Sequence, residues 1–109
     1  MKSYTDLEQS KKLAEILSLE SADMHYVLID SDQETYSPGL GKYYGVLPSI
    51  LCWSLTGLLS VLPTGKVLLH DKGNHGYKCI CNNIDSYYFN NPVDACVAMI
   101  ERLHELKIL

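Results

Sequence analysis

LCWSLTGLLSVLP, residues 51–63, is the stretch that decides the fold, because it carries no charge and holds the only tryptophan of the chain. Four of its leucines follow the i, i+3, i+4, i+7 spacing that places side chains on one face of a helix. They are Leu55, Leu58, Leu59 and Leu62. A helix of about two turns is not stable alone in water. The pattern therefore predicts a short helix that is held in place by burial in a core.

The same stretch carries start and stop signals for this helix. Ser54 is suited to the N-cap, since its hydroxyl accepts a hydrogen bond from an amide of the first turn. Trp53 and Leu58 then occupy the two positions of a hydrophobic staple. Pro63 ends the helix, because the residue before a proline is pushed out of the helical region. An alternative start at Ser49 would lengthen the helix; we prefer Ser54.

The composition of the chain is that of one globular domain. Its 109 residues are 47% hydrophobic and 20% charged, and the formal net charge is −4. Proteins that bind nucleic acids gain affinity from Lys and Arg, and this chain has only nine. The acidic balance therefore disfavours nucleic acid and an anionic membrane surface as partners.

The N-terminal residues lack the apolar segment of a secretion signal, so we expect a cytoplasmic protein of bacterial type. Four cysteines in such a chain are more typical of reduced thiols than of disulfides.

Helix and strand signals alternate around the central stretch. Thr5 and Glu8 form a capping box that starts a first helix, which should end near Ser18. Asn91 and Pro92 start a last helix. The expected strands are residues 24–29, 35–37, 66–70 and 77–81, with 42–46 and 87–89 as further candidates. Pro38 to Gly41 should end the second strand.

These elements predict a single α+β domain in which a mainly antiparallel sheet of about four to five strands packs with three helices. The strands are apolar on both faces, whereas a half-exposed antiparallel sheet alternates apolar with polar residues. Either helices cover both faces of the sheet, or a partner covers one of them.

Cysteines are the first candidates for chemistry. Cys79 and Cys81 lie on the same side of a strand, and with His70 or His75 they could form a zinc site. The alternative is core packing, because buried cysteine behaves as a small hydrophobe. Cys52 precedes a helix N-terminus, which can lower the pKa of a thiol. No particular histidine is placed as its base, and we assign no catalytic residue, metal or cofactor.

Tyrosines are the second candidates. Tyr43, Tyr44, Tyr87 and Tyr88 stand in adjacent pairs within extended segments, so one ring of each pair should face outward. Exposed tyrosine is enriched at protein–protein interfaces. The alternative is that the rings lie on the rim of the sheet with their hydroxyls in water. We favour an interface.

Residues 53–63 and 94–103 together resemble a set of short proteins of gut bacterial genomes, often encoded near prophages or mobile elements. The C-terminal half carries most of this resemblance, which implies a small cytoplasmic α+β accessory protein and assigns no activity. From the residues we predict a non-enzymatic interaction module that forms homo-oligomers or binds a protein partner. The alternatives are a thiol-dependent enzyme using Cys52 or the Cys79/Cys81 pair, and a metal-binding domain.

Overall fold

The computed structural model describes residues 1–41, 45, 49–71, 73 and 76–109 of the chain. It is a small α+β fold that measures 43 × 31 × 20 Å along its principal axes. The helices are α1 (Leu7–Ile16), α2 (Leu55–Val61) and α3 (Pro92–Glu105), with a short 3-10 turn at Leu19–Ser21. The strands are β1 (Met24–Asp30), β2 (Thr35–Leu40), β3 (Ser49–Cys52), β4 (Val67–Asp71), β5 (Gly76–Cys81) and β6 (Ile84–Asp85).

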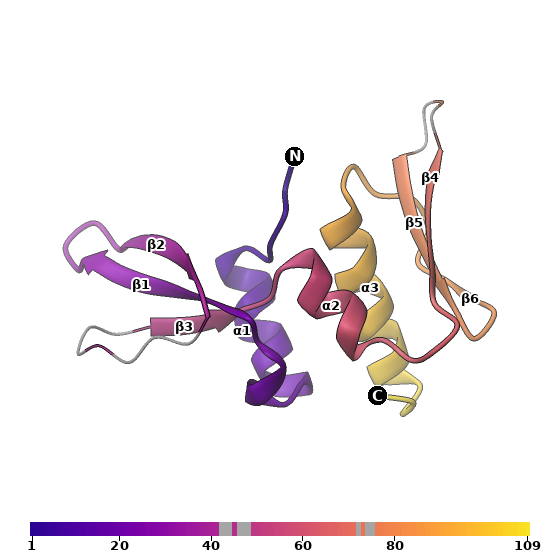
Figure 1. Cartoon of the computed structure of the whole chain (residues 1–109), viewed down its shortest axis with the longest axis horizontal. Coiled ribbons are helices and arrows are strands. Elements are labelled where there is room, and N and C mark those ends of the chain that lie inside the picture. Colours follow the sequence, from indigo (N-terminus) through magenta and orange to yellow (C-terminus); the bar gives the residue numbers. More distant parts are fainter. Residues whose placement is uncertain (42–44, 46–48, 72, 74–75) are drawn as a thin grey trace.

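The strands form two sheets, so the expectation of one sheet with four to five strands is wrong. One antiparallel sheet has the order β2-β1-β3 and the other has the order β4-β5-β6. The two sheets lie at opposite ends of the long axis, with α2 and α3 between them (Figure 1). Each sheet is built from strands close in sequence, and α2 separates β3 from β4 along the chain. Each group of strands therefore pairs within itself.

The central stretch forms the short helix that its leucine spacing predicts. Ser54 is the N-cap of α2, and its Oγ accepts from the Gly57 amide at 3.1 Å. Trp53 and Leu58 are both completely buried. A start at Ser49 is excluded, because Ser49–Cys52 pairs with β1 as β3. This strand was not expected; its backbone hydrogen bonds go to a neighbouring strand, not along a helix.

Helix α1 starts one residue later than its capping box suggests. The N-cap is Asp6, whose Oδ1 accepts from the Gln9 amide at 2.8 Å, while the Gln9 side chain accepts from the Asp6 amide. Thr5 is fully buried, and its amide donates to the Trp53 carbonyl oxygen at 2.9 Å. Because this backbone bond holds Thr5 beside Trp53, the cap passes to Asp6.

Strand β2 continues through Pro38 and Gly39, where the sequence predicts a break. Among the described strands β2 pairs only with β1 and so forms a sheet edge, and proline is tolerated at a sheet edge because no partner there needs its missing amide hydrogen. Gly39 lies opposite His25, and a Cβ at this position would lie 2.7 Å from His25 Nε2. The glycine therefore makes room for the imidazole. The candidate strand at 42–46 falls almost entirely outside the described residues.

The C-terminal half confirms the predicted hairpin and helix. β4 and β5 pair antiparallel, with Leu68 opposite Cys79. The third strand is β6 and not residues 87–89, of which Phe89 makes only an isolated bridge to Tyr77. Asn91 caps α3 by accepting from the Asp94 amide at 2.8 Å, and Pro92 stands in its first turn.

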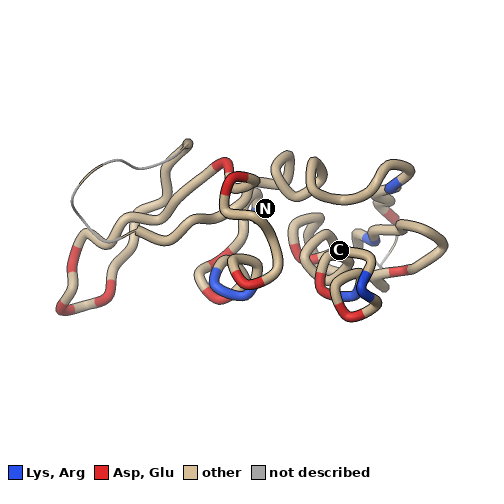
Figure 2. Tube along the Cα trace, turned by 90° about the horizontal axis from the view of Figure 1, so that it is seen from below, with Lys and Arg blue, Asp and Glu red and all other residues tan. Residues whose placement is uncertain are grey.

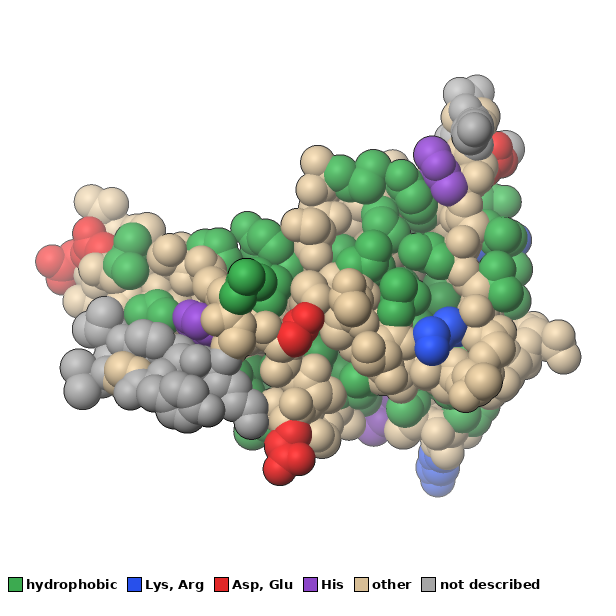
Figure 3. Space-filling view, viewed as in Figure 1, with side chains coloured by type: hydrophobic (Ala, Val, Ile, Leu, Met, Phe, Trp, Pro, Cys, Tyr) green, Lys and Arg blue, Asp and Glu red, His purple; other side chains and the backbone are tan. Residues whose placement is uncertain are grey.

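Two clusters of buried apolar residues hold these elements together. The larger surrounds α3 and takes most of its buried residues from α1, α2, α3 and β5, while Ala22, Trp53 and Leu62 lie just outside these elements. Its other buried members are Leu13, Leu58, Cys79, Cys81, Val93, Ala95, Cys96, Val97, Met99, Ile100 and Leu103. The smaller lies between α1 and the sheet β2-β1-β3, and its buried residues are Met24, Tyr26 and Cys52. On the face shown in Figure 3, hydrophobic side chains gather over α2 and α3.

Candidate interaction surface

The outward face of the sheet β4-β5-β6 presents apolar side chains. Strand register places Val67 opposite Ile80 and Leu69 opposite Lys78, and Ile80 lies opposite Asp85 of β6. We call these five residues the outer sheet face. Val67 is 46% exposed and Leu69 is 42% exposed. The residues between them on the strands point to the opposite face, since Leu68 packs against the core around α3 and Cys79 is completely buried. The strands are therefore apolar on both faces, as the sequence predicts.

Strand β4 is also an edge of its sheet, because among the described strands it pairs only with β5. An edge strand presents backbone N–H and C=O groups that can pair with another chain. The edge strand β2 of the other sheet contains Pro38, which removes one such donor. No proline interrupts β4. The open edge and the outer sheet face thus adjoin along β4.

The charged groups on this face are paired with each other. Lys78 Nζ lies 2.6 Å from the Asp85 carboxylate and 5.0 Å from the centre of the Tyr88 ring. The hydrogen bond from Lys78 lowers the pKa of Asp85, and the same bond raises the pKa of Lys78. Both groups therefore stay charged at neutral pH, and their charges offset each other.

Of the four tyrosines predicted at an interface, the structure describes Tyr87 and Tyr88, and these two lie on different surfaces. Tyr88 is 40% exposed and lies beside the outer sheet face through its contact with Lys78. Tyr87 is 78% exposed, has φ of 67°, and lines a hollow of about 600 Å³ beside α3. Tyr43 and Tyr44 lie outside the described residues. Of the predicted interface residues, Tyr88 is therefore the one that adjoins the outer sheet face.

The cysteines are free thiols, and all four are buried. Burial, with a smaller contribution from Asp23, raises the pKa of Cys52 to about 12. Burial therefore outweighs the lowering of the Cys52 pKa that was expected from the helix N-terminus. Cys96 on α3 has its pKa raised by a hydrogen bond with Cys79 and by burial. The same hydrogen bond lowers the pKa of Cys79, but this thiol is completely buried. Because a nucleophilic cysteine must be both accessible and deprotonated, the burial of all four thiols favours core packing over catalysis.

The candidate zinc ligands that the structure describes are Cys79, Cys81 and His70, and they do not form a metal-binding group. Cys79 and Cys81 point together into the core around α3, as their spacing predicts. His70 instead stacks on Tyr77, with ring centroids 4.2 Å apart and an angle of 4° between the planes. His75 is not among the described residues. Within the part of the chain that the structure describes, no group of three or more His, Cys, Asp or Glu residues is placed to hold a metal ion.

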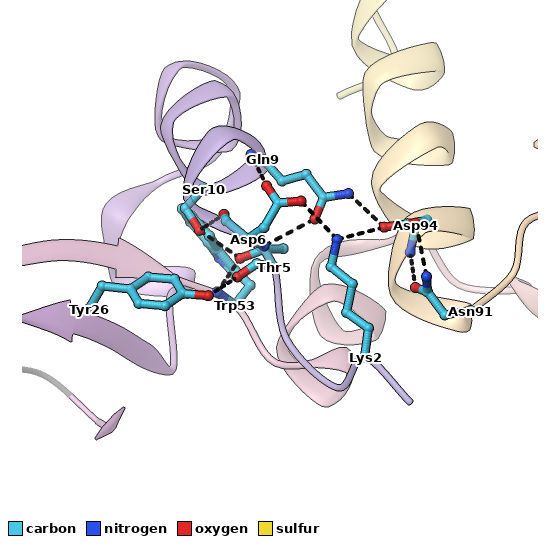
Figure 4. Close-up of polar contacts among 9 residues, drawn as sticks. All are labelled: Lys2, Thr5, Asp6, Gln9, Ser10, Tyr26, Trp53, Asn91 and Asp94. Atoms are coloured by element: carbon cyan, nitrogen blue, oxygen red, sulfur yellow. Dashed lines mark hydrogen bonds and ion pairs between the residues drawn. The ribbon is translucent and has the colours of Figure 1, made fainter. Parts of the chain in front are cut away.

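A polar network that the sequence does not reveal joins the N-terminal segment to α3 (Figure 4). Asp94 accepts from Lys2 Nζ and from Gln9 Nε2, each at 2.8 Å, and its other oxygen accepts from Asn91. Lys2 also donates to Asp6 at 2.9 Å. Lys2 and Asp94 are 92 positions apart in sequence, and no local pattern predicts their pairing. The network thus ties the N-terminal segment and α1 to the first turn of α3.

The buried end of this network uses hydroxyl groups. Tyr26 donates to the Thr5 carbonyl oxygen at 2.7 Å, and the Thr5 and Ser10 hydroxyls are 2.8 Å apart. Thr5 Oγ1 also accepts from the Trp53 amide at 3.1 Å. The hydroxyls of Thr5, Ser10 and Tyr26 are therefore all hydrogen-bonded where α1, β1 and the end of β3 meet.

Comparisons with family models, with curated proteins and with solved structures found no match to this chain. The resemblance to proteins of gut bacterial genomes thus stays a prediction. Among the described residues, no helix has the length and apolar character needed to cross a membrane.

Proposed function

We propose that the chain is a non-enzymatic interaction module that forms a homodimer through β4 and the outer sheet face. The observation that carries this proposal is the pair Val67 and Leu69, which stand nearly half exposed on an edge strand. Apolar side chains beside unpaired strand edges are characteristic of surfaces that add a strand from another chain.

A second copy of the chain fits this edge in its pattern of side chains. In a two-fold antiparallel pairing centred on Leu68, Val67 of each copy lies opposite Leu69 of the other, because paired residues share a face of the sheet. The result is one six-stranded sheet with a continuous apolar row across its centre. Lys78 and Asp85 of each copy stay paired at the flanks of that row.

A dilution series tests the proposal, with mass measured by light scattering or sedimentation. We expect a concentration-dependent monomer–dimer equilibrium. Leu69→Lys should shift the chain to monomer, because two like charges would face the partner edge. A chain that stays monomeric at all concentrations would contradict the proposal.

Leu40→Lys is the matched control, since Leu40 is 82% exposed on the edge strand β2 of the other sheet. If general stickiness of exposed leucines caused association, this change would have the larger effect. We expect it to leave the dimer intact. Dissociation by Leu40→Lys as strong as that by Leu69→Lys would place the interface elsewhere. Circular dichroism of both variants checks that each remains folded.

A further inference from the structure

The hydrogen bonds of β5 show which backbone groups of β4 face its open edge. Tyr77 exchanges two backbone hydrogen bonds with Phe89, while Cys79 accepts from the Ser86 amide and donates to the Ser86 hydroxyl. The backbone groups of Tyr77 and Cys79 therefore point to the β6 side of the strand. Because successive residues of an antiparallel strand alternate in this direction, the residues between them, such as Lys78, bond to β4.

The same alternation holds along β4. Lys78 lies opposite Leu69, so the N–H and C=O groups of Leu69 are directed to β5. The N–H and C=O groups of Lys66, Leu68 and His70 then point to the open edge. In a two-fold pairing centred on Leu68, these are the groups that meet, with Leu68 opposite Leu68 and His70 opposite Lys66 of the other copy.

The side chains of His70 and Lys66 lie on the inner face of the sheet, together with Leu68. The imidazole of His70 is stacked parallel to the Tyr77 ring of β5, which holds it beside the strand edge. His70 is exposed and Lys66 is half-buried. Within one copy the two are four residues apart on the strand, whereas across the two-fold axis they are direct neighbours.

Acidic side chains of the adjoining elements are directed away from His70. Figure 2 marks the acidic positions of the chain in red. Asp71 follows His70 in β4, so it points to the outer face, where it accepts from an amide of the next turn at 2.8 Å. Asp94, in the first turn of α3, accepts from Lys2. Within the described part of one copy, the titratable side chain that faces the imidazole is therefore Tyr77.

We propose that the homodimer dissociates as the pH falls from about 8 to 5.5, because His70 of each copy then carries a charge opposite Lys66 of the other. This pH dependence rests on the proposed homodimer. Histidine is the side chain that ordinarily gains its positive charge in this interval. Like charges directly opposite each other on two strands destabilise the pairing, and the two-fold axis repeats the pair. Acid therefore favours the separated copies, in which His70 has no cation opposite it.

Sedimentation of a dilution series at the two ends of this pH interval tests the proposal, because carboxylates keep their charge throughout it. We expect the dissociation constant of the dimer to rise about 3–10-fold on acidification, as two like-charged cross-strand pairs predict. A chain that is monomeric at both pH values would overturn the homodimer and its pH dependence together. A dimer with the same dissociation constant at both would overturn the pH dependence alone.

Variants assign the effect to the two side chains. Lys66→Glu should reverse its direction, so that acid tightens the dimer, because a charged imidazole then meets a carboxylate. His70→Gln should remove the pH dependence. His104→Gln is the matched control, since His104 lies in the last turn of α3 and contacts the Leu109 carbonyl oxygen; it should leave the pH dependence intact. A pH dependence that survives His70→Gln, or keeps its direction in Lys66→Glu, would overturn the assignment.

Amide hydrogen exchange tests the register of the two copies. On going from dilute to concentrated protein, the amides of Leu68 and His70 should gain protection, because they bond to the second copy. The amides of Val67 and Leu69 bond to β5 and should be protected at both concentrations. If Leu68 and His70 gained no protection in a dimeric sample, the copies would pair through another surface, and the contact of His70 with Lys66 would be excluded. Circular dichroism at both pH values checks that each variant is folded.

Discussion

The two sheets have the same number of strands and the same antiparallel pairing, but they are held by different interactions. The sheet β4-β5-β6 packs against α3 in a core that includes Leu58, Ile100 and Leu103, all completely buried. Among the described residues, the sheet β2-β1-β3 has only Met24, Tyr26 and Cys52 in the buried cluster beneath it. There, hydrogen bonds of Tyr26, Thr5 and Ser10 accompany the packing.

This difference implies unequal local stability. Burial of apolar surface is the dominant favourable term in folding, and net hydrogen bonds contribute only about 1 kcal/mol each. Regions with few buried apolar contacts open at lower free energy than the core around which the chain folds. We expect the sheet β2-β1-β3 to open first and the core around α3 to unfold last.

The largest effect should come from the tryptophan. Trp53→Ala is expected to lower the free energy of unfolding by about 3–5 kcal/mol, because it leaves a cavity in the larger core. The half-buried Ile50 packs on the smaller cluster, and Ile50→Ala should cost less, about 2 kcal/mol. Urea unfolding followed by circular dichroism measures both. Equal losses of unfolding free energy in the two variants would contradict the difference in stability between the two cores.

Two glycines give a second contrast, one from each sheet. Gly76 has φ of 90°, and a Cβ there would lie 2.2 Å from the Phe89 carbonyl oxygen, which is backbone. Gly76→Ala should therefore cost about 3 kcal/mol. Gly39→Ala would meet the His25 side chain, at 2.7 Å, and should cost about 1–2 kcal/mol, because the imidazole can move only by giving up its hydrogen bond with the Gly41 carbonyl oxygen. Thermal melts of the two variants test this order, and a reversed order would contradict it.

The network that joins Lys2 to α3 predicts a pH dependence. Burial alone would raise the pKa of Asp94, but the hydrogen bonds from Lys2, Gln9 and Asn91 lower it. Since its folded pKa lies below its unfolded value, Asp94 contributes stability above about pH 4, and this contribution is lost as the pH falls through the folded pKa.

Asp94→Asn should cost about 1.5 kcal/mol at pH 7 and almost nothing in acid, where both proteins carry a neutral group. Unfolding measured from pH 7 to pH 2 checks this. Glu105→Gln is a control, because Glu105 pairs with Arg102 at 3.6 Å on the exposed face of α3 and should change little. If the unfolding free energies of Asp94→Asn and the parent differed by the same amount at every pH, the charge of Asp94 would not contribute to stability.

The smallest perturbation is chemical labelling of the native protein. All four thiols are buried, so each should react only when its surroundings open. Cys52 belongs to the smaller cluster and should be modified faster than Cys79, Cys81 and Cys96. Peptide mass analysis over time gives the order. Immediate reaction of Cys52 would support an accessible thiol and revive the enzymatic alternative.

Local signals in the sequence predicted local structure well. The leucine spacing and Ser54 gave the position of α2, and Asn91 with Pro92 gave the start of α3. The predictions of secondary structure were wrong where hydrogen bonds to a distant segment determined the local conformation. Pairing with β1 turned residues 49–52 into a strand, and pairing of Thr5 with Trp53 moved the cap of α1 to Asp6.

The surface features also differ in whether local sequence could predict them. The two-faced apolar pattern of residues 66–70 predicted that either helices or a partner cover the second face of the sheet, and the structure leaves Val67 and Leu69 nearly half exposed there. The network of Asp94 was not predicted, since Lys2 and Gln9 come from the opposite end of the chain.

The position of α3 in the chain has a consequence for synthesis on the ribosome. Residues 1–54 contain α1 and the whole sheet β2-β1-β3, so these elements can assemble as soon as they emerge. The hairpin β4–β5 must wait with the inward side of Leu68 and Cys79 uncovered until α3, which follows it, has been made. The less stable half is thus completed first during vectorial synthesis, and the nascent chain is most exposed to aggregation just before α3 appears.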